Sequence, residues 1–266
     1  MTIELDIELI RNIIIRGKRL DGRKFDEYRN LEIEKDVVSS AEGSARVKLG
    51  NTDIIAGVKM EIGKPYPDSP ADGTMSVSIE LLPLASPEFE IGPPRENAIE
   101  LARVVDRAIR ESKAIDFSKL CIKENEAVWM AYIDIDVLND DGNLMDACGI
   151  AAITALLTAK LPKYKNENDK YSVEYGTKSE DGIPMDGIPV STTFVKIGTE
   201  IITDPGLPES EALDARLTVG TLEGNKLCSL QKGGNTGLSV MEIERIIELA
   251  VKHGDDIRSL IKRSIE

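Results

Sequence analysis

The chain has 266 residues, 41% of them hydrophobic, which is enough for one large or two small domains with a buried core. Its formal charge of −14 excludes a general positive field for coating nucleic acid, although a local basic patch is compatible with it. No run approaches the roughly 18 apolar residues of a membrane span, and the acidic N-terminal stretch is not a signal peptide, so we expect a cytoplasmic protein without membrane contact.

The metal-binding and nucleophilic residue types are scarce. Cys121, Cys148 and Cys228 are far apart and fit neither a disulfide framework nor a metal spacing, which favours a reducing compartment. The single histidine, His253, precedes Gly254 in a late helical segment, where we expect a surface position near a helix end. We therefore expect no cofactor, no metal site and no histidine-based catalysis.

The first third of the chain predicts one helix followed by strands. Residues 3–16 have helical spacing and end at Gly17, with an apolar stripe of Leu5, Leu9 and Ile13. Residues 31–63 alternate as strands around a Gly50-Asn51 hairpin turn. A Pro-rich loop at 64–74 then leads into another strand.

The middle of the chain predicts a helix, a strand and a second helix. Residues 96–112 form a helix after Pro93-Pro94, with a predicted apolar stripe of Ile99, Ala102, Val105 and Ile109. A strand follows whose predicted apolar face consists of Trp129, Ala131, Ile133, Ile135 and Val137. The helix at about 143–160 is apolar nearly all round, which indicates burial.

The last third predicts a loop, a second block of strands and a long helix. Residues 162–189 are polar and read as a loop, followed by strands at 190–197, 199–203, 213–221 and 226–234. The final helix runs from Ser239 to about Arg263, and Ser239 with Glu242 forms a capping box. This order predicts an α+β fold with helices on a sheet face.

A strand–turn–helix segment at 138–155 has the geometry that often holds a phosphate. Its helix begins with Leu144, however, where an anion site needs a basic side chain, and Asp140 and Asp141 add negative charge beside it. The segment therefore reads as a degenerate phosphate turn formed by Gly142, Asn143 and Leu144.

Other polar residues have two interpretations each. Arg95, Arg103 and Arg107 are candidates for RNA contact, or they form ion pairs with Glu96, Glu100 and Asp106 or with a neighbouring subunit. Asp134 and Asp136 share one strand face, where they could hold a cation or simply face solvent. Asp204 either has a functional role or forms a turn after a strand.

Four blocks in this order resemble the RNase PH-like family, and within it the non-catalytic ring subunits of the archaeal exosome. They are RLDGRKFDEYRNLEIE, GSARVKLGNTDIIAGVK, ELLPLASPEFEIGPPRENAIELARVVDRAIRES and DVLNDDGNLMDACGIAAITALL. The resemblance implies an RNase PH-like fold of two βαβα-type halves with helices packed on mixed sheets. We assign 1–17 to an N-terminal helix, 18–163 to the first half and 164–266 to the second, as one compact unit.

The resemblance also implies partners. Such subunits pair with a catalytic RNase PH-like paralogue in a hexameric ring of three heterodimers, which carries RNA-binding cap subunits and degrades single-stranded RNA from its 3′ end. The inactive subunit contributes arginines to its partner's active site, which implies that role for Arg95, Arg103 or Arg107.

Active relatives differ from this chain at their reacting groups. They carry an arginine where this turn has Leu144, and two arginines where this chain has Arg95 and Glu96. They also carry a second aspartate about six residues after the counterpart of Asp204; here that position is Ser210, with Glu209 and Glu211 beside it as partial substitutes. The resemblance thus implies a subunit without catalytic residues; the alternative is an autonomous phosphate-dependent 3′–5′ exoribonuclease.

Overall fold

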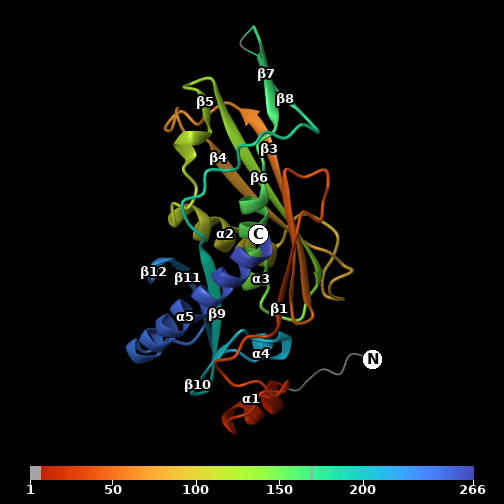
Figure 1. The fold of residues 1–266 in the computed structure, drawn as a ribbon. Coiled ribbons are helices and arrows are strands. Elements are labelled where there is room, and N and C mark those ends of the chain that lie inside the picture. Colours follow the sequence, from red (N-terminus) through yellow and green to blue (C-terminus); the bar gives the residue numbers. More distant parts are fainter. Residues whose placement is uncertain (1–6, 169) are drawn as a thin grey trace.

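The structure is a computed structural model that describes residues 7–168 and 170–266. Its first half forms a mixed sheet with strand order β1-β2-β3-β6-β4, in which β5 also pairs with β6 (Figure 1). β4 runs parallel to β6, and the other pairs are antiparallel. The strands are β1 (Leu31–Lys35), β2 (Gly43–Leu49), β3 (Thr52–Gly63), β4 (Thr74–Leu81), β5 (Cys121–Lys123) and β6 (Ala127–Asn139).

The second half forms an antiparallel sheet in the order β10-β9-β11-β12. Its strands are β9 (Val190–Ile197), β10 (Glu200–Thr203), β11 (Ala215–Leu222) and β12 (Lys226–Gly234). They confirm the strands that alternation predicted for this region, with ends shifted by at most a few residues.

The described helices are α1 (Ile7–Ile15), α2 (Glu96–Glu111), α3 (Leu144–Thr158), α4 (Leu207–Glu211) and α5 (Val240–Ile265), with a 3₁₀ turn, η1 (Phe117–Leu120). Three of the described helices, α2, α3 and α5, contact both sheets. α3 packs against β2 and β3 on one side and β9 on the other, while α2 packs on β4 and reaches β12. α5 packs on β9 and β11 and extends to β1. No described helix is long and apolar enough to cross a membrane.

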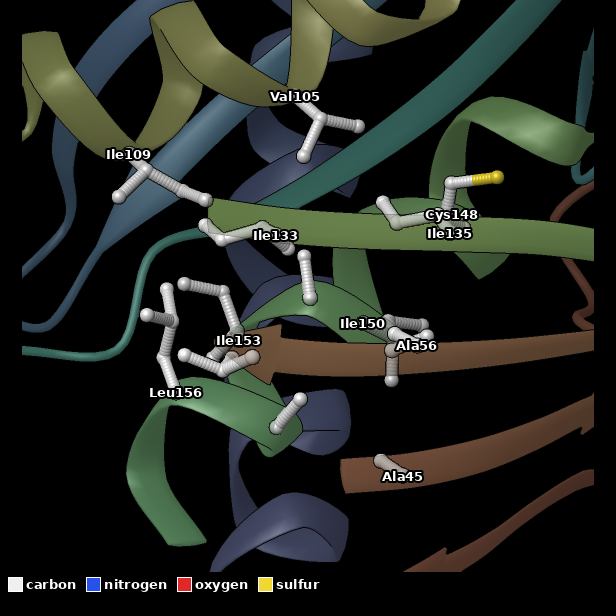
Figure 2. Packing of buried hydrophobic residues seen from close by; sticks show 14 of the residues in the cluster. Ala45, Ala56, Val105, Ile109, Ile133, Ile135, Cys148, Ile150, Ile153 and Leu156 are labelled. Carbon is white, nitrogen blue, oxygen red and sulfur yellow. The ribbon is translucent and has the colours of Figure 1, made fainter. Parts of the chain in front are cut away.

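The main core lies between α2, α3 and the first sheet (Figure 2). The predicted apolar face of β6 is confirmed, because Trp129, Ala131, Ile133, Ile135 and Val137 are all at most 5% exposed. α3 is buried on nearly all sides because it lies between two sheets, as its composition predicted. Each large aliphatic side chain buried there stabilises the fold by about 1.5–3 kcal/mol.

The core also joins the two halves. Its largest cluster includes Ile188, Ile257 and Ile261 from the second half. Each half orders its elements as strands, helix, strands, helix, which confirms the α+β fold class. The boundary between 163 and 164 stays a prediction.

The predicted loop at 162–189 is wrong in part, since it contains a hairpin of β7 (Lys163–Glu167) and β8 (Lys170–Glu174). The hairpin projects from the end of the molecule opposite α1 (Figure 1). Every residue of β7 is exposed, so no buried face imposes the alternation that marks a strand.

Three smaller predictions are also corrected. In α1 the buried residues are Ile10 and Ile14, whereas Leu9 of the predicted apolar stripe is exposed. Positions 3–6 of the predicted helix lie outside the described residues. α2 buries Leu101 and Val104 beside Val105 and Ile109, whereas Ile99 is 45% exposed, because the helix contacts both sheets.

His253 is buried and does not lie at a helix end. Its ring packs against Tyr28 at 4.9 Å between centroids, and α5 continues to Ile265. Gly254 permits close packing there, because a Cβ would lie 2.3 Å from Thr221 Oγ1. The capping box of Ser239 and Glu242 is confirmed at the start of α5.

Candidate nucleic-acid interface

The turn at 140–143 keeps a specific backbone shape. Gly142 N–H donates to Asp140 Oδ1 at 2.9 Å, and both Gly142 (φ 85°) and Asn143 (φ 54°) are left-handed. A Cβ at Gly142 would lie 2.5 Å from the backbone of Gly206 and Leu207, so only glycine fits. The first residue of α3 is then Leu144.

The polar side chains behind this turn bind one another. Asn143 Nδ2 donates to Asp146 Oδ2 and Asp204 Oδ1, both at 2.8 Å. Asp204 also accepts from Arg29 Nε at 2.9 Å, from Arg29 Nη2 at 2.8 Å and from Arg23 Nη1 at 2.9 Å. The backbone N–H of Arg29 is a further donor to Asp204. This fully buried carboxylate therefore has hydrogen-bond donors from the protein on both oxygens.

The electrostatics of Asp204 suit a structural ion pair. Burial raises its pKa, but hydrogen bonds and charge from Arg29 outweigh that effect, so the pKa lies below its usual value. The carboxylate therefore stays ionised at neutral pH. Asp204 follows β10 in a left-handed turn, as the turn interpretation predicted.

The two acids beside the predicted second position, Glu209 and Glu211, have different surroundings. Glu209 is buried, and its carboxylate binds Arg19 Nε at 2.8 Å and Nη2 at 2.6 Å. It also accepts from the N–H of Gly206 at 2.9 Å. Glu209 thus joins the connector before β1 to α4. Glu211 is exposed to solvent. Of Glu209, Ser210 and Glu211, only Ser210 lines the cavity described below.

Asp146 lies beneath the turn and binds three elements. It accepts from Tyr28 Oη at 2.6 Å, from Thr193 N at 2.9 Å and from Thr193 Oγ1 at 2.7 Å, besides Asn143. Burial raises the pKa of Asp146 to about 6, although these donors oppose the shift. Burial, followed by the charges of Asp146 and Asp204, raises the pKa of Tyr28 well above its usual value, so Tyr28 remains a neutral donor.

A cavity of about 240 Å³ opens in front of the turn. Apolar side chains line much of it: Leu81, Phe89, Leu101, Leu144, Met145, Val195, Leu207 and Leu213. Its charged lining residues are Asp140, Glu100 and Arg216, and Arg216 Nη2 pairs with Glu100 Oε1 at 2.5 Å. Among the described residues that line this cavity, the one cation is Arg216, and its charge is already paired with Glu100.

The arginines of α2 divide into two groups. Arg95 is the N-cap residue and pairs with Glu90 on the surface. Arg103 and Arg107 lie one turn apart on the exposed side of the helix. Arg107 Nη1 donates to Gln231 Oε1 at 2.9 Å, and Arg103 has no hydrogen-bond or ion-pair partner among the described residues. The structure therefore brings Arg103 and Arg107 together and leaves Arg95 about 12 Å away along the helix.

Sequence patterns missed two residues beside these arginines, Arg216 and Gln231. The available signal for Arg216 was that it is the one charged residue of the strand ARLTVGTL, whereas no pattern marked Gln231. Asp134 accepts from Ser78 Oγ at 2.6 Å on the outer sheet face. Burial, with Glu80 and Asp134 nearby, raises the pKa of Asp136. No group of three or more His, Cys, Asp or Glu residues in the described part of the chain is placed to hold a metal.

The fold and the turn define an RNase PH-like protein. Residues 27–162 match domain 1 of the 3′ exoribonuclease family, and residues 187–253 match its domain 2. The chain belongs to this family.

Its relatives are exosome proteins. The chain is 46% identical to exosome complex component Rrp42 of Thermococcus kodakarensis, over 97% of this chain and 93% of that protein. It is 43% identical to Rrp42 of Methanopyrus kandleri, over 98% of this chain and all of that protein. A solved structure of the Archaeoglobus fulgidus exosome with RNA bound to the active site contains a chain with a TM-score of 0.85 and 40% identity, covering 95% of this chain and 96% of that one. A chain of an archaeal exosome core has a TM-score of 0.83 and 38% identity, covering 96% of this chain and 97% of that one. The resemblance inferred from sequence blocks is confirmed.

Proposed function

We propose that the chain is a non-catalytic ring subunit of an archaeal exosome, which shapes the active site of a catalytic paralogue and helps bind single-stranded RNA for 3′–5′ degradation. The observation that carries the proposal is the turn of Gly142, Asn143 and Leu144, which keeps its backbone shape while its polar groups bind inside the protein. An arginine–phosphate contact contributes about 1.5–3 kcal/mol, so leucine at this position removes a large part of phosphate affinity.

The family, the relatives and the exposed arginine pair together support the proposed assembly. We propose a hexameric ring of three heterodimers, cap subunits that bind RNA, and a cytoplasmic location. Arg103 and Arg107 are the proposed RNA-binding residues on this chain, and Arg95 is a weaker candidate because Glu90 neutralises it.

A phosphorolysis assay tests the proposal directly. The chain alone, incubated with a 3′-tailed RNA, magnesium and phosphate, is expected to release no nucleoside diphosphate. Added to its paralogue, it is expected to stimulate release strongly, because it completes the ring. Nucleoside diphosphate release by the chain alone would instead support the autonomous exoribonuclease and place the phosphate on groups other than this turn.

The arginine pair gives a second prediction. Reversing both charges, Arg103→Glu with Arg107→Glu, should weaken RNA binding by the assembled ring more than tenfold at low salt, because attraction to two phosphates becomes repulsion. The salt dependence of binding should also become less steep, by about 0.7 per lost phosphate contact in log–log form. Fluorescence anisotropy with a labelled single strand over a salt series measures both.

The matched control places the same charge change elsewhere. Lys163→Glu with Lys165→Glu alters the exposed β7–β8 hairpin at the far end of the molecule (Figure 1). At each salt concentration of the series this variant should lose much less RNA affinity than the arginine variant, and at physiological salt it should stay within about twofold of the wild type, because salt screens exposed charges that lie far from the bound strand. Equal losses in both variants would mean that net charge, and not the α2 pair, governs binding.

A further inference from the structure

Arg103 and Arg107 have carboxylates within helical reach that could neutralise them. Glu100 is three residues before Arg103, Asp106 is three residues after it, and Glu111 is four residues after Arg107. Residues at such spacings are neighbours on a helix surface, and opposite charges there form ion pairs. A free α2 helix would therefore lose much of its positive potential.

A residue of the second sheet pairs with Glu100, so Glu100 is not available to Arg103. Arg216 of β11 reaches across to α2, and its Nη2 pairs with Glu100 Oε1 at 2.5 Å. Gly233 on β12 leaves room for the guanidinium of Arg216, because a Cβ at Gly233 would lie 2.9 Å from Arg216 Nη2 and 3.1 Å from its Cζ. The side chain of Arg216 is 21% exposed, so this ion pair is less screened than one in open solvent.

Asp106 is held by a different arginine. Arg110 Nε donates to Asp106 Oδ2 at 3.1 Å, and Arg110 Nη2 donates to Oδ1 at 2.8 Å. The same Nη2 also donates to the backbone oxygen of Met75 at 3.1 Å, which fixes the guanidinium against β4. A bidentate pair of this kind leaves little attraction for Arg103.

Arg107 has a neutral partner. Its Nη1 donates to the amide oxygen of Gln231 on β12, which orients the guanidinium without cancelling its charge. Arg103 and Arg107 lie between two depressions beside α2 and line both of them. One depression also contains Gln231, Glu96 and Glu100, and the other contains Asp106, Arg110 and Glu111. Gln231 thus holds the Arg107 guanidinium by a neutral hydrogen bond, and in the described part of the chain no ion pair joins Arg107 to Glu96 or Glu111.

We propose that Arg216 and Gln231 are positioning residues that keep Arg103 and Arg107 free of carboxylates, so that the pair presents two unneutralised charges to the phosphodiester backbone of single-stranded RNA. The inference rests on the proposed function and adds to it a role for the second sheet. Without Arg216, Glu100 pairs with Arg103 along the helix and cancels one of the two charges.

The test uses the chain assembled with its catalytic paralogue, and a single-stranded oligonucleotide as probe. Arg216→Gln should weaken RNA binding about fivefold and lower the salt slope by about 0.7, the value for one lost contact to a single strand. The double variant Arg216→Gln with Glu100→Gln should restore both values, because no carboxylate is then released. A purely structural role for Arg216 predicts no rescue.

Gln231→Glu gives an independent variant that removes no ion pair. It places a carboxylate against Arg107 and should reduce RNA affinity and the salt slope about as much as Arg216→Gln. The control Arg46→Gln removes the arginine of another ion pair, with Asp53 on the first sheet, and should leave both values unchanged.

The outcomes separate the inference from the proposed function. If Arg103→Glu with Arg107→Glu weakens binding but Arg216→Gln and Gln231→Glu do not, the inference is overturned and the proposed function stands. If Glu100→Gln fails to rescue Arg216→Gln, Arg216 acts by a structural role or by touching RNA itself, and its positioning role is overturned. If the double arginine variant binds RNA normally, the RNA-binding role of α2 fails and the inference with it.

Discussion

Replacing Asp204 with asparagine should lower the free energy of unfolding by about 3–5 kcal/mol, the loss seen when one partner of a buried ion pair is removed. Asp204 is fully buried and accepts from Arg23, Arg29 and Asn143. An amide at this position presents N–H groups to donors and leaves the charge of Arg29 uncompensated in a largely buried site. Urea denaturation of the purified chain, followed by circular dichroism, measures the change.

A surface pair supplies the control for this variant. Lys165 and Glu174 pair at 2.5 Å across the β7–β8 hairpin, with side chains 63% and 29% exposed. Glu174→Gln should change the free energy of unfolding by no more than about 1 kcal/mol, because solvent screens the pair. A loss no larger for Asp204→Asn than for Glu174→Gln would show that the buried network is not a main source of stability.

The same network fixes the shape of the turn by contacts within the protein. Gly142 is required by close packing on Gly206 and Leu207, and Asn143 ties Asp146 to Asp204. These contacts connect α3 of the first half to the segment after β10 in the second. We therefore expect the turn to contribute to folding whether or not an anion binds, whereas the side chain of Leu144 makes none of the hydrogen bonds of this network.

Periodicity predicted the elements that have one buried and one exposed face. β6 alternates because one of its faces is buried in the core, and α5 begins with a capping box that is local in sequence. The β7–β8 hairpin was not predicted, because every residue of β7 is exposed and no buried face imposes an alternating pattern. The face of α1 was assigned wrongly because its apolar residues surround most of the helix, so spacing alone did not choose between Leu9 and Ile10.

The site was only partly predictable, because its contacts join distant residues. The turn and the arginine pair are local patterns, and both were recognised. The ion pair of Arg29 with Asp204 spans 175 residues, and that of Arg216 with Glu100 spans 116. Nothing in the sequence near either member specifies such a partner, since the fold alone brings them together.

Asp146 should give the chain a distinctive dependence of stability on pH. Burial raises the pKa of Asp146 to about 6 in the folded protein, from 3.8 for an ordinary aspartate. Between these values the folded state holds more protons than the unfolded state, so this residue makes stability fall as pH rises from about 4 to about 6. The shift of about two pKa units corresponds to roughly 3 kcal/mol in full, of which roughly 2 kcal/mol is present at pH 4 and lost by pH 7.

Comparing the wild type with Asp146→Asn isolates this effect, because asparagine does not titrate. The free energy of unfolding of the wild type minus that of the variant should decrease by roughly 2 kcal/mol between pH 4 and pH 7 in urea titrations. Asp214 should show the opposite pH dependence, because hydrogen bonding from Arg11 lowers its pKa. The difference in free energy of unfolding between the wild type and Asp214→Asn should therefore stay level above pH 4 and shrink only below it. A difference for Asp146→Asn that increased with pH would mean that donation from Tyr28, Asn143 and Thr193 outweighs burial, and that Asp146 is held as a carboxylate like Asp204.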